Sequence, residues 1–230
     1  MILTPGSQRH LAWCVRSAQW QYLRWLDEEA VKGVIDLGAH VGAYSLMAKM
    51  LQPQASVLAV EPEPDTYAIL RQNVSWLGIK TLLAALGDGS EFAMSQAGRK
   101  DRMDCQYDKK GDCSGDASTV PSYMLSRFAE MMSVEPDKLF WKIDVQGAEF
   151  RYVTRNQDAL FVLQQSVGFF VELDGGWDTQ SAWWLESFPR THILSWKKSR
   201  RGTGIICGRR GNVSVLGPIP FEIQSQPASA

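Results

Sequence analysis

The chain has 230 residues, which is enough for one large domain or two small ones. It is 45% hydrophobic and 21% charged, an ordinary globular composition with ample material for a core. The formal net charge of -1 gives no overall argument for a nucleic-acid partner. No stretch approaches about 18 consecutive apolar residues, so we expect no transmembrane helix. The first residues also lack the basic region and apolar run of a signal peptide.

Cysteines and histidines are few and scattered. None of the four cysteines stands in a CxxC pair, and with only three histidines the spacing fits no zinc signature. We therefore expect no metal site. Reduced thiols in a cytoplasmic protein are the simplest interpretation.

Residues 7–30 carry apolar side chains at three- and four-residue steps, which predicts a helix. Ser7 is a candidate N-cap and Gly33 a candidate stop. We interpret residues 1–33 as an N-terminal helical cover packed over one end of a sheet. Closure of this segment over a ligand is the alternative.

Short apolar strands then alternate with helices. The pattern predicts strands at residues 34–37, 56–60 and 81–86 and helices at residues 41–51 and 64–77. This alternation is typical of a parallel sheet with helices on both faces. Right-handed crossovers bring the carboxyl ends of the parallel strands to one edge.

The polar, turn-rich residues 87–118 interrupt the alternation, and we interpret them as a loop insertion. The following elements are predicted in this order: a helix at 121–132, a strand at 139–145, a helix at 147–163, a strand at 167–173 and a helix at 178–188. The last two strands, 191–197 and 203–208, are joined by a short basic turn. Because that turn has no room for a crossover helix, they form an antiparallel hairpin.

The predicted fold is therefore α/β, with a doubly wound, mostly parallel sheet and a C-terminal antiparallel hairpin. We assign this domain to residues 34–216. Residues 217–230 are rich in Pro, Ser and Gln, and we interpret them as a flexible tail.

The turn after the first strand carries an acid and two glycines. Asp36 lies at the end of the strand, and Gly38 and Gly42 let the backbone turn and a ligand approach. A dinucleotide fingerprint would need its second glycine where His40 stands, and a pyrophosphate would meet that imidazole. An acid just before the glycines suits a ligand that has a cationic end and no phosphate. S-adenosylmethionine, with its ammonium and sulfonium groups, is such a ligand.

Glu61 ends the second strand, near the spacing at which an acid accepts hydrogen bonds from ribose hydroxyls. A carboxylate there can take both hydroxyls at once. Pro62 or Pro64 then starts the next helix. The alternative is a solvated acid that interacts favourably with the helix dipole. Because Asp36 and Gly38 lie upstream, we favour ribose binding by Glu61 over this alternative.

Five segments carry a family resemblance: residues 36–42, 60–64, 84–88, 141–149 and 171–173. In their order and spacing they resemble the FkbM-type S-adenosylmethionine-dependent methyltransferases. The resemblance implies a class I, Rossmann-like fold with a seven-stranded sheet. It also implies methylation of a hydroxyl on a small molecule, sugar or glycan.

The resemblance further implies roles for single residues. Asp36 and Gly38 would cradle the methionine part, Glu61 would take the ribose, and Asp88 or its neighbours would border the adenine. A plain turn role in the Gly-Asp-Gly stretch is the alternative for Asp88. The residues expected to bind the cofactor are Asp36, Gly38, Ala39, His40, Gly42, Glu61, Pro62, Asp88 and Asp144.

Two positions depart from the family pattern. His40 stands where the family usually has Asn, and Gln146 where it usually has Glu. Gln146 can act neither as a base nor as a metal-linked acid. A module that binds S-adenosylmethionine without catalysis is therefore an alternative function.

Three residues are candidates for the chemistry. Asp144 follows the fourth strand of the alternation, and the resemblance makes it the best catalytic candidate, because a carboxylate can hold or deprotonate a hydroxyl. A structural ion pair is the alternative. Lys142 shares a strand face with Asp144, and we expect it to pair with Asp144 or Glu172. Glu172, at the end of the fifth strand, is a second candidate for acceptor binding.

Six basic residues and no acid fall within residues 197–210. We interpret them as a solvated hairpin edge, where Lys and Arg deter edge-to-edge aggregation. The alternative is a grip on a phosphate backbone, as in an RNA methyltransferase.

Overall fold

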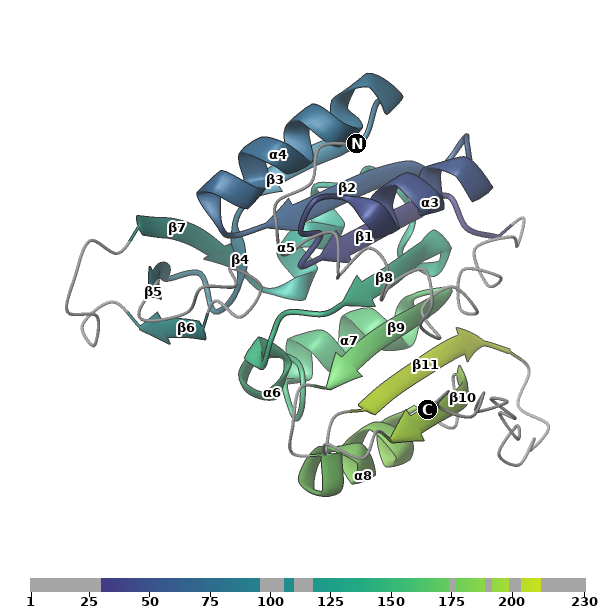
Figure 1. Cartoon of the computed structure of the whole chain (residues 1–230). Coiled ribbons are helices and arrows are strands. Elements are labelled where there is room, and N and C mark those ends of the chain that lie inside the picture. The colour runs from purple at the N-terminus through teal and green to yellow at the C-terminus, as the bar shows by residue number, and fades with distance from the viewer. Residues whose placement is uncertain are drawn as a thin grey trace, which may run out of the picture.

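Figure 1 shows the computed structural model of the chain, which describes residues 30–95, 106–109, 118–173, 177–188, 192–198 and 204–211. The predicted N-terminal helix, apart from residue 30, lies outside the described residues, and so does the predicted tail at 217–230.

A seven-stranded sheet forms the centre of the fold, in the order β10-β11-β9-β8-β1-β2-β3 (Figure 1). Its strands are β1 (Gly33–Leu37), β2 (Ser56–Glu61), β3 (Lys80–Leu83), β8 (Leu139–Ile143), β9 (Gly168–Leu173), β10 (His192–Lys198) and β11 (Gly204–Arg210). The first five strands pair in parallel, and β11 pairs antiparallel with both β9 and β10. The predicted α/β fold, with its mostly parallel sheet and C-terminal antiparallel hairpin, is confirmed.

Helices cover both faces of this sheet. They are α3 (Ala43–Leu51), α4 (Pro64–Val74), α5 (Leu125–Glu130), α6 (Ala148–Tyr152), α7 (Gln157–Gln165) and α8 (Trp177–Ser187). On one face, Ala48 of α3 and Leu70 of α4 join a core that includes Val34, Phe140 and Phe170 of the strands. Because the central strands are covered on both sides, every residue of β1 and β8 is buried.

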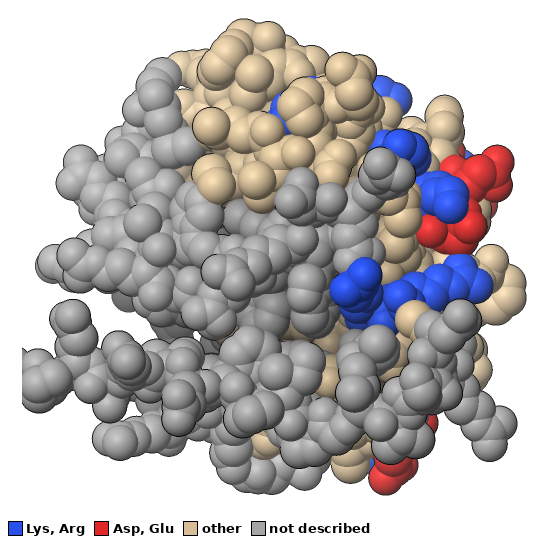
Figure 2. All heavy atoms as spheres, turned by 90° about the vertical axis from the view of Figure 1, so that its right-hand side faces the viewer, with Lys and Arg blue, Asp and Glu red and all other residues tan. Residues whose placement is uncertain are grey.

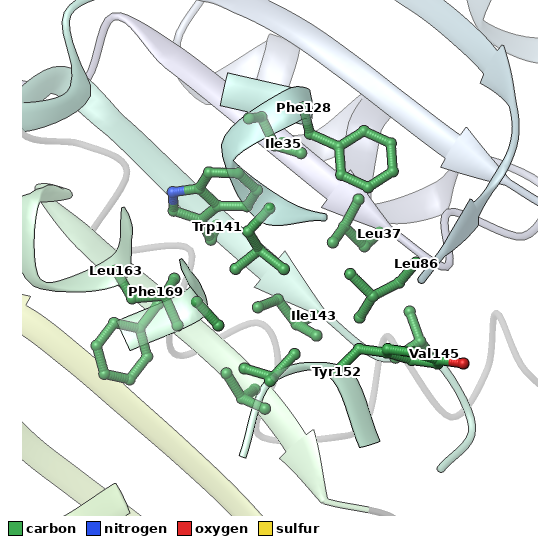
Figure 3. Close-up of a cluster of buried hydrophobic side chains, with 14 of the residues drawn as sticks. Ile35, Leu37, Leu86, Phe128, Trp141, Ile143, Val145, Tyr152, Leu163 and Phe169 are labelled. Atoms are coloured by element: carbon green, nitrogen blue, oxygen red, sulfur yellow. The ribbon is translucent and has the colours of Figure 1, made fainter. Parts of the chain in front are cut away.

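The opposite face holds the larger core, which Figure 3 shows in close-up. Trp141 of β8 and Phe169 of β9 are fully buried there, together with Phe128 of α5 and Leu163 of α7. Each large side chain of this kind contributes about 1.5–3 kcal/mol by leaving water. Alternation along each strand therefore divides its residues between two cores.

The interpretation of residues 87–118 as a loop is wrong for residues 91–95, 106–109 and 118, which belong to strands. A second, four-stranded sheet stands there, in the order β4-β7-β5-β6. Its strands are β4 (Ala85–Leu86), β5 (Glu91–Ser95), β6 (Gln106–Lys109) and β7 (Ser118–Tyr123). The predicted strand at 81–86 is thus divided between two sheets, as β3 and β4. The first residues of the helix predicted at 121–132 belong to β7, which pairs with β5 and β4. The helix itself begins only at Leu125.

Local capping explains the remaining differences at helix ends. Pro64 opens α4, and the Glu63 carboxylate accepts from the backbone N–H groups of Asp65 and Thr66. That helix ends at Val74, before a short 3-10 turn. The structure has two helices, α6 and α7, where a single helix is predicted at 147–163. The side-chain oxygen of Asn156 accepts from the backbone N–H groups of Asp158 and Ala159 and so caps the start of α7. No helix in the described ranges is long and apolar enough to cross a membrane.

Candidate functional site

The predicted site residues converge where the parallel strands end. Leu37, the last residue of β1, has Val60 of β2 and Ile143 of β8 as its register partners. The segments that follow these three positions therefore leave the sheet side by side. This is the edge at which open α/β sheets bind their ligands.

The turn after β1 is tightly packed. Gly38 has a φ of 74°, and a Cβ there would lie 1.8 Å from the backbone oxygen of Asp144. Gly42 has a φ of 91°, and its Cβ would lie 2.6 Å from a methyl group of Val74. Both positions need glycine for conformation and for space.

Backbone hydrogen bonds attach this turn to the end of β2. The N–H groups of Gly38 and Ala39 both donate to the Val60 carbonyl, at 3.0 and 2.9 Å. His40 has a φ of 51°, and its backbone N–H donates to Glu61 Oε2 at 2.9 Å. The structure thus brings the glycine turn and Glu61 together, as the motif spacing predicts.

Asp36 is fully buried beneath the turn. Its Oδ2 accepts a 2.6 Å hydrogen bond from Ser45 Oγ, and its Oδ1 lies 3.1 Å from Lys142 Nζ. Both carboxylate oxygens are therefore engaged by the protein, and Asp36 contributes a fixed negative charge below the site. Sequence reasoning missed Ser45, because it lies on the next helix and no spacing rule links it to Asp36.

Lys142 joins the two strand-end aspartates. Its buried ammonium donates to the carbonyls of Gly38 and Leu37, at 2.7 and 3.2 Å. It lies 3.1 Å from Asp36 Oδ1 and 3.7 Å from Asp144 Oδ2. The predicted pairing with Asp144 is confirmed, but Asp36 is the closer partner. Sequence reasoning missed the pairing of Lys142 with Asp36, because β8 and β1 are neighbours only in the folded sheet.

Asp144 is 7% exposed and lies at the start of the turn after β8. Its Oδ1 accepts a 3.1 Å hydrogen bond from Nε2 of the exposed Gln146. Gly147 then caps α6 with a φ of 97°, and its N–H donates to the buried Glu149 at 2.9 Å. Among the described residues, no atom lies within 4 Å of a Cβ built on Gly147. This turn therefore borders open space, unlike the turn after β1.

Glu172 is the residue of β9 next to Asp144 along the sheet edge. It follows Val171, whose register partner is Ile143, and it is half-buried. This placement makes it a neighbour of Asp144, and acceptor binding by Glu172 stays a prediction.

Glu61 is a buried acid, 7% exposed, and its carboxylate also accepts from the backbone N–H of Glu63 at 3.0 Å. Burial raises the pKa of Glu61 from 4.5 to about 7, although the two backbone donors and the Lys142 charge oppose the rise. Each carboxylate oxygen has more than one lone pair, so capacity remains for ribose hydroxyls. Pro62, the next residue, is buried and leads into the cap of α4.

Asp88 lies beyond β4 and is exposed. Its Oδ1 accepts from the backbone N–H and the hydroxyl of Ser90, at 3.2 and 2.5 Å. These bonds are those of a turn residue. A contact of Asp88 with adenine stays a prediction.

Tyr44, on the first turn of α3, was missed by sequence reasoning. Its ring packs 6.5 Å from that of Phe170, and its buried hydroxyl has no hydrogen-bond partner among the described residues. Burial, followed by the charge of Asp36, raises the pKa of Tyr44 well above its usual 10. Nothing in the sequence spacing marks this residue.

The basic residues of the hairpin lie at both ends of its strands. Lys198 pairs with Gly204, which pairs with Leu173 at the carboxyl end of β9, where the site lies. Arg209 pairs with Gly168 at the amino end of β9. Figure 2 shows the face towards which β11 ends, where described Lys and Arg side chains lie beside Asp and Glu. The guanidinium of Arg210 donates to the Gln165 carbonyl at 2.8 Å.

The residues present fit S-adenosylmethionine. The missing Cβ of Gly38 and of Gly42 makes room for Asp144 and Val74 rather than for a ligand. Asp36 and Asp144 together outweigh the single positive charge of Lys142. An excess negative charge suits a sulfonium and an ammonium. No cluster of three or more His, Cys, Asp or Glu side chains within the described ranges could hold a metal ion.

Known proteins resemble this chain in sequence and in fold. Residues 36–190 match the Methyltransferase FkbM domain. A 61-residue segment is 36% identical to Methyltransferase sdnD of Sordaria araneosa, and it covers 25% of this chain and about a quarter (24%) of that protein. The solved structure of human methyltransferase 10 domain containing protein superposes with a TM-score of 0.50 at 14% identity, covering 84% of this chain and 81% of that one. The structural likeness concerns the fold alone.

Proposed function

Because the chain belongs to the FkbM family of methyltransferase domains, we propose that it transfers the methyl group of S-adenosylmethionine to a hydroxyl of a small molecule, sugar or glycan. The observation that carries the proposal is the Asp144 carboxylate. It lies at the ligand-binding edge of the sheet, held by an amide and an ammonium, beside the open turn of Gly147.

Cofactor binding falls to the turn after β1 and to the end of β2. Glu61 accepts the ribose hydroxyls, and Gly38, Ala39, His40 and Gly42 shape the turn against which the methionine part rests. Asp36 and Asp144 would compensate the charges of the ammonium and the sulfonium. Pro62 sets the exit of the chain from Glu61, and Asp88 borders the adenine.

S-adenosylmethionine supplies an electrophilic methyl carbon on a positively charged sulfur. The acceptor oxygen forms a bond to that carbon while the carbon–sulfur bond breaks, and the bonding pair stays on sulfur. Asp144 accepts the proton of the acceptor hydroxyl and later releases it to water. Glu172 holds the acceptor from the neighbouring strand, and Lys142 forms an ion pair with Asp144.

Calorimetry with S-adenosylhomocysteine tests the cofactor half. We expect binding to the wild-type chain, weakened roughly ten- to hundredfold by Glu61→Gln, because a hydrogen bond to a charged group contributes about 1.5–3 kcal/mol. Absence of binding to the wild type would contradict the proposal.

A methyl-transfer screen tests the acceptor half. Cell metabolites and glycans are incubated with S-adenosylmethionine carrying a deuterated methyl group, and labelled products are found by mass spectrometry. Asp144→Asn is expected to keep S-adenosylhomocysteine affinity within about twofold while transfer falls at least about a hundredfold. Full transfer by this variant would remove Asp144 from the chemistry.

The two alternatives have distinct outcomes. A binding module without catalysis would bind S-adenosylhomocysteine and label nothing. An RNA methyltransferase would label RNA and lose RNA binding when Arg200 and Arg201 are neutralised, whereas a small-molecule or glycan enzyme would not.

A further inference from the structure

Gln146 has an unusual backbone for its residue type. Its φ of 54° lies in the left-handed region, which L side chains rarely adopt and which glycine adopts freely. The side chain is exposed, so burial gives no reason for a glutamine there. Its Nε2 nevertheless makes a defined contact, a 3.1 Å hydrogen bond to Asp144 Oδ1.

This hydrogen bond complements the ion pair between the Asp144 carboxylate and Lys142. Oδ1 faces the Gln146 amide, and Oδ2 faces Lys142 Nζ at 3.7 Å. A hydrogen bond on Oδ1 and an ion pair on Oδ2 together restrict the rotation of the carboxylate about its Cβ–Cγ bond. We propose that Gln146 is a positioning residue, which holds the Asp144 carboxylate in the orientation that meets the methyl group and the acceptor hydroxyl. The inference rests on the proposed function.

An amide suits this task because it donates without carrying a charge. Asp144 already has charged neighbours: Lys142 lies 3.7 Å away and also contacts Asp36, and Glu172 follows Val171, the register partner of Ile143. A further carboxylate about 3 Å from Asp144 would compete for the acceptor's proton, because two carboxylates in contact tend to share one. Gln146 donates to Asp144 without adding a further carboxylate beside it.

Two cofactor analogues test the inference without a known acceptor. S-adenosylhomocysteine has a neutral sulfur, whereas sinefungin carries an amine-bearing carbon in place of the methylsulfonium. A well-oriented Asp144 therefore binds sinefungin preferentially. Calorimetry at pH 7 gives the ratio of the two dissociation constants for the wild type, Gln146→Gly, Gln146→Glu and Asp144→Asn. Arg155→Gly is the matched control, because Arg155 also has a left-handed φ, of 61°.

We expect Gln146→Gly to lower the sinefungin preference about three- to tenfold, with S-adenosylhomocysteine affinity within twofold and no decrease in melting temperature. Arg155→Gly should leave both affinities unchanged. In Gln146→Glu the preference should vary with pH between 5 and 8, as the paired carboxylates lose their shared proton, and it should vary less in the wild type.

Other outcomes distinguish a failure of the positioning role of Gln146 from a failure of the proposed function. If Asp144→Asn abolishes the preference and Gln146→Gly keeps it within twofold, Gln146 is not a positioning residue. If Asp144→Asn also keeps the preference while S-adenosylhomocysteine binds, Asp144 does not face the methyl group and the inference falls. If S-adenosylhomocysteine does not bind the wild type, the proposed function itself fails.

Discussion

The turns after β1 and β8 are built alike but lie in different surroundings. Each follows an aspartate at or near the strand end, Asp36 or Asp144, and each enters a helix through a left-handed glycine without a side-chain cap. Gly42 before α3 and Gly38 beside it leave no room for a Cβ, whereas Gly147 before α6 faces open space. One turn is closed by packing, and the other is open.

This difference matches a division of tasks in the proposed reaction. A closed turn has one backbone shape, which suits a cofactor that is the same in every cycle. The second turn has room beside Gly147 among the described residues, which suits an acceptor that differs among methyltransferases. Lys142 is the physical link, because its ammonium contacts the aspartates of both turns.

Removal of that link should have the largest effect. Lys142→Met leaves the Asp36 charge buried with the Ser45 hydroxyl as its remaining partner among the described residues, and loss of one member of a buried ion pair costs about 3–5 kcal/mol. We expect the free energy of unfolding, measured in urea, to fall by about that amount. The double variant Asp36→Asn with Lys142→Met should lose less than the single one. A single-variant loss below about 1 kcal/mol would show that the two turns are not joined in this way.

The closed turn itself gives the second prediction. Gly38→Ala adds left-handed strain of about 1–2 kcal/mol. It also adds overpacking of about 1–3 kcal/mol, because the new methyl group would meet the Asp144 backbone oxygen at 1.8 Å. Urea unfolding should therefore show a loss of about 2–5 kcal/mol. A loss near zero would mean that this turn is not closed by packing.

The fold was largely predictable because its signals are local. Alternating apolar strands and helices identified the central sheet, and the short basic stretch at 198–202 identified the hairpin. The second sheet was missed because β5 and β7 gain their strand character from pairing with each other across a long segment. Asn156, a good cap residue, was a readable signal for the break between α6 and α7.

The site was predictable to the level of motifs and no further. Strand ends and glycines located Asp36, Glu61 and Asp144 at one edge. The hydrogen bond of Ser45 to Asp36 and that of Gln146 to Asp144 depend on turn conformation and strand order, which no spacing in the sequence states.

The third prediction concerns the proton on Glu61, which accepts from the closed turn. The folded pKa of about 7 exceeds the ordinary 4.5, so the folded state binds a proton that the unfolded state has lost between these values. The contribution of Glu61 to the free energy of unfolding therefore falls by about 3 kcal/mol as pH rises from 4.5 to 7. Glu61→Gln should abolish that fall.

His192 provides the opposite slope in the same protein. It packs between Phe169 and Phe188, and burial lowers its pKa from 6.5 to about 4. The unfolded state then binds the extra proton, so stability rises by about 3 kcal/mol as pH rises from 4 to 6.5. The wild type should be nearly flat in urea titrations from pH 4.5 to 6.5, Glu61→Gln should rise, and His192→Gln should fall. Equal slopes for the wild type and Glu61→Gln would contradict the assignment to Glu61.

The smallest effect is expected at the open turn. Gly147→Ala adds left-handed strain of about 1–2 kcal/mol but no clash, because no described atom lies within 4 Å of the new methyl group. Gly147→Asn should lose less, since Asn tolerates left-handed backbone better than Ala. Both variants should bind S-adenosylhomocysteine within about twofold of the wild type. A Gly147→Ala loss as large as that of Gly38→Ala would show that the second turn is as closely packed as the first, and the division between a closed cofactor turn and an open acceptor turn would then fail.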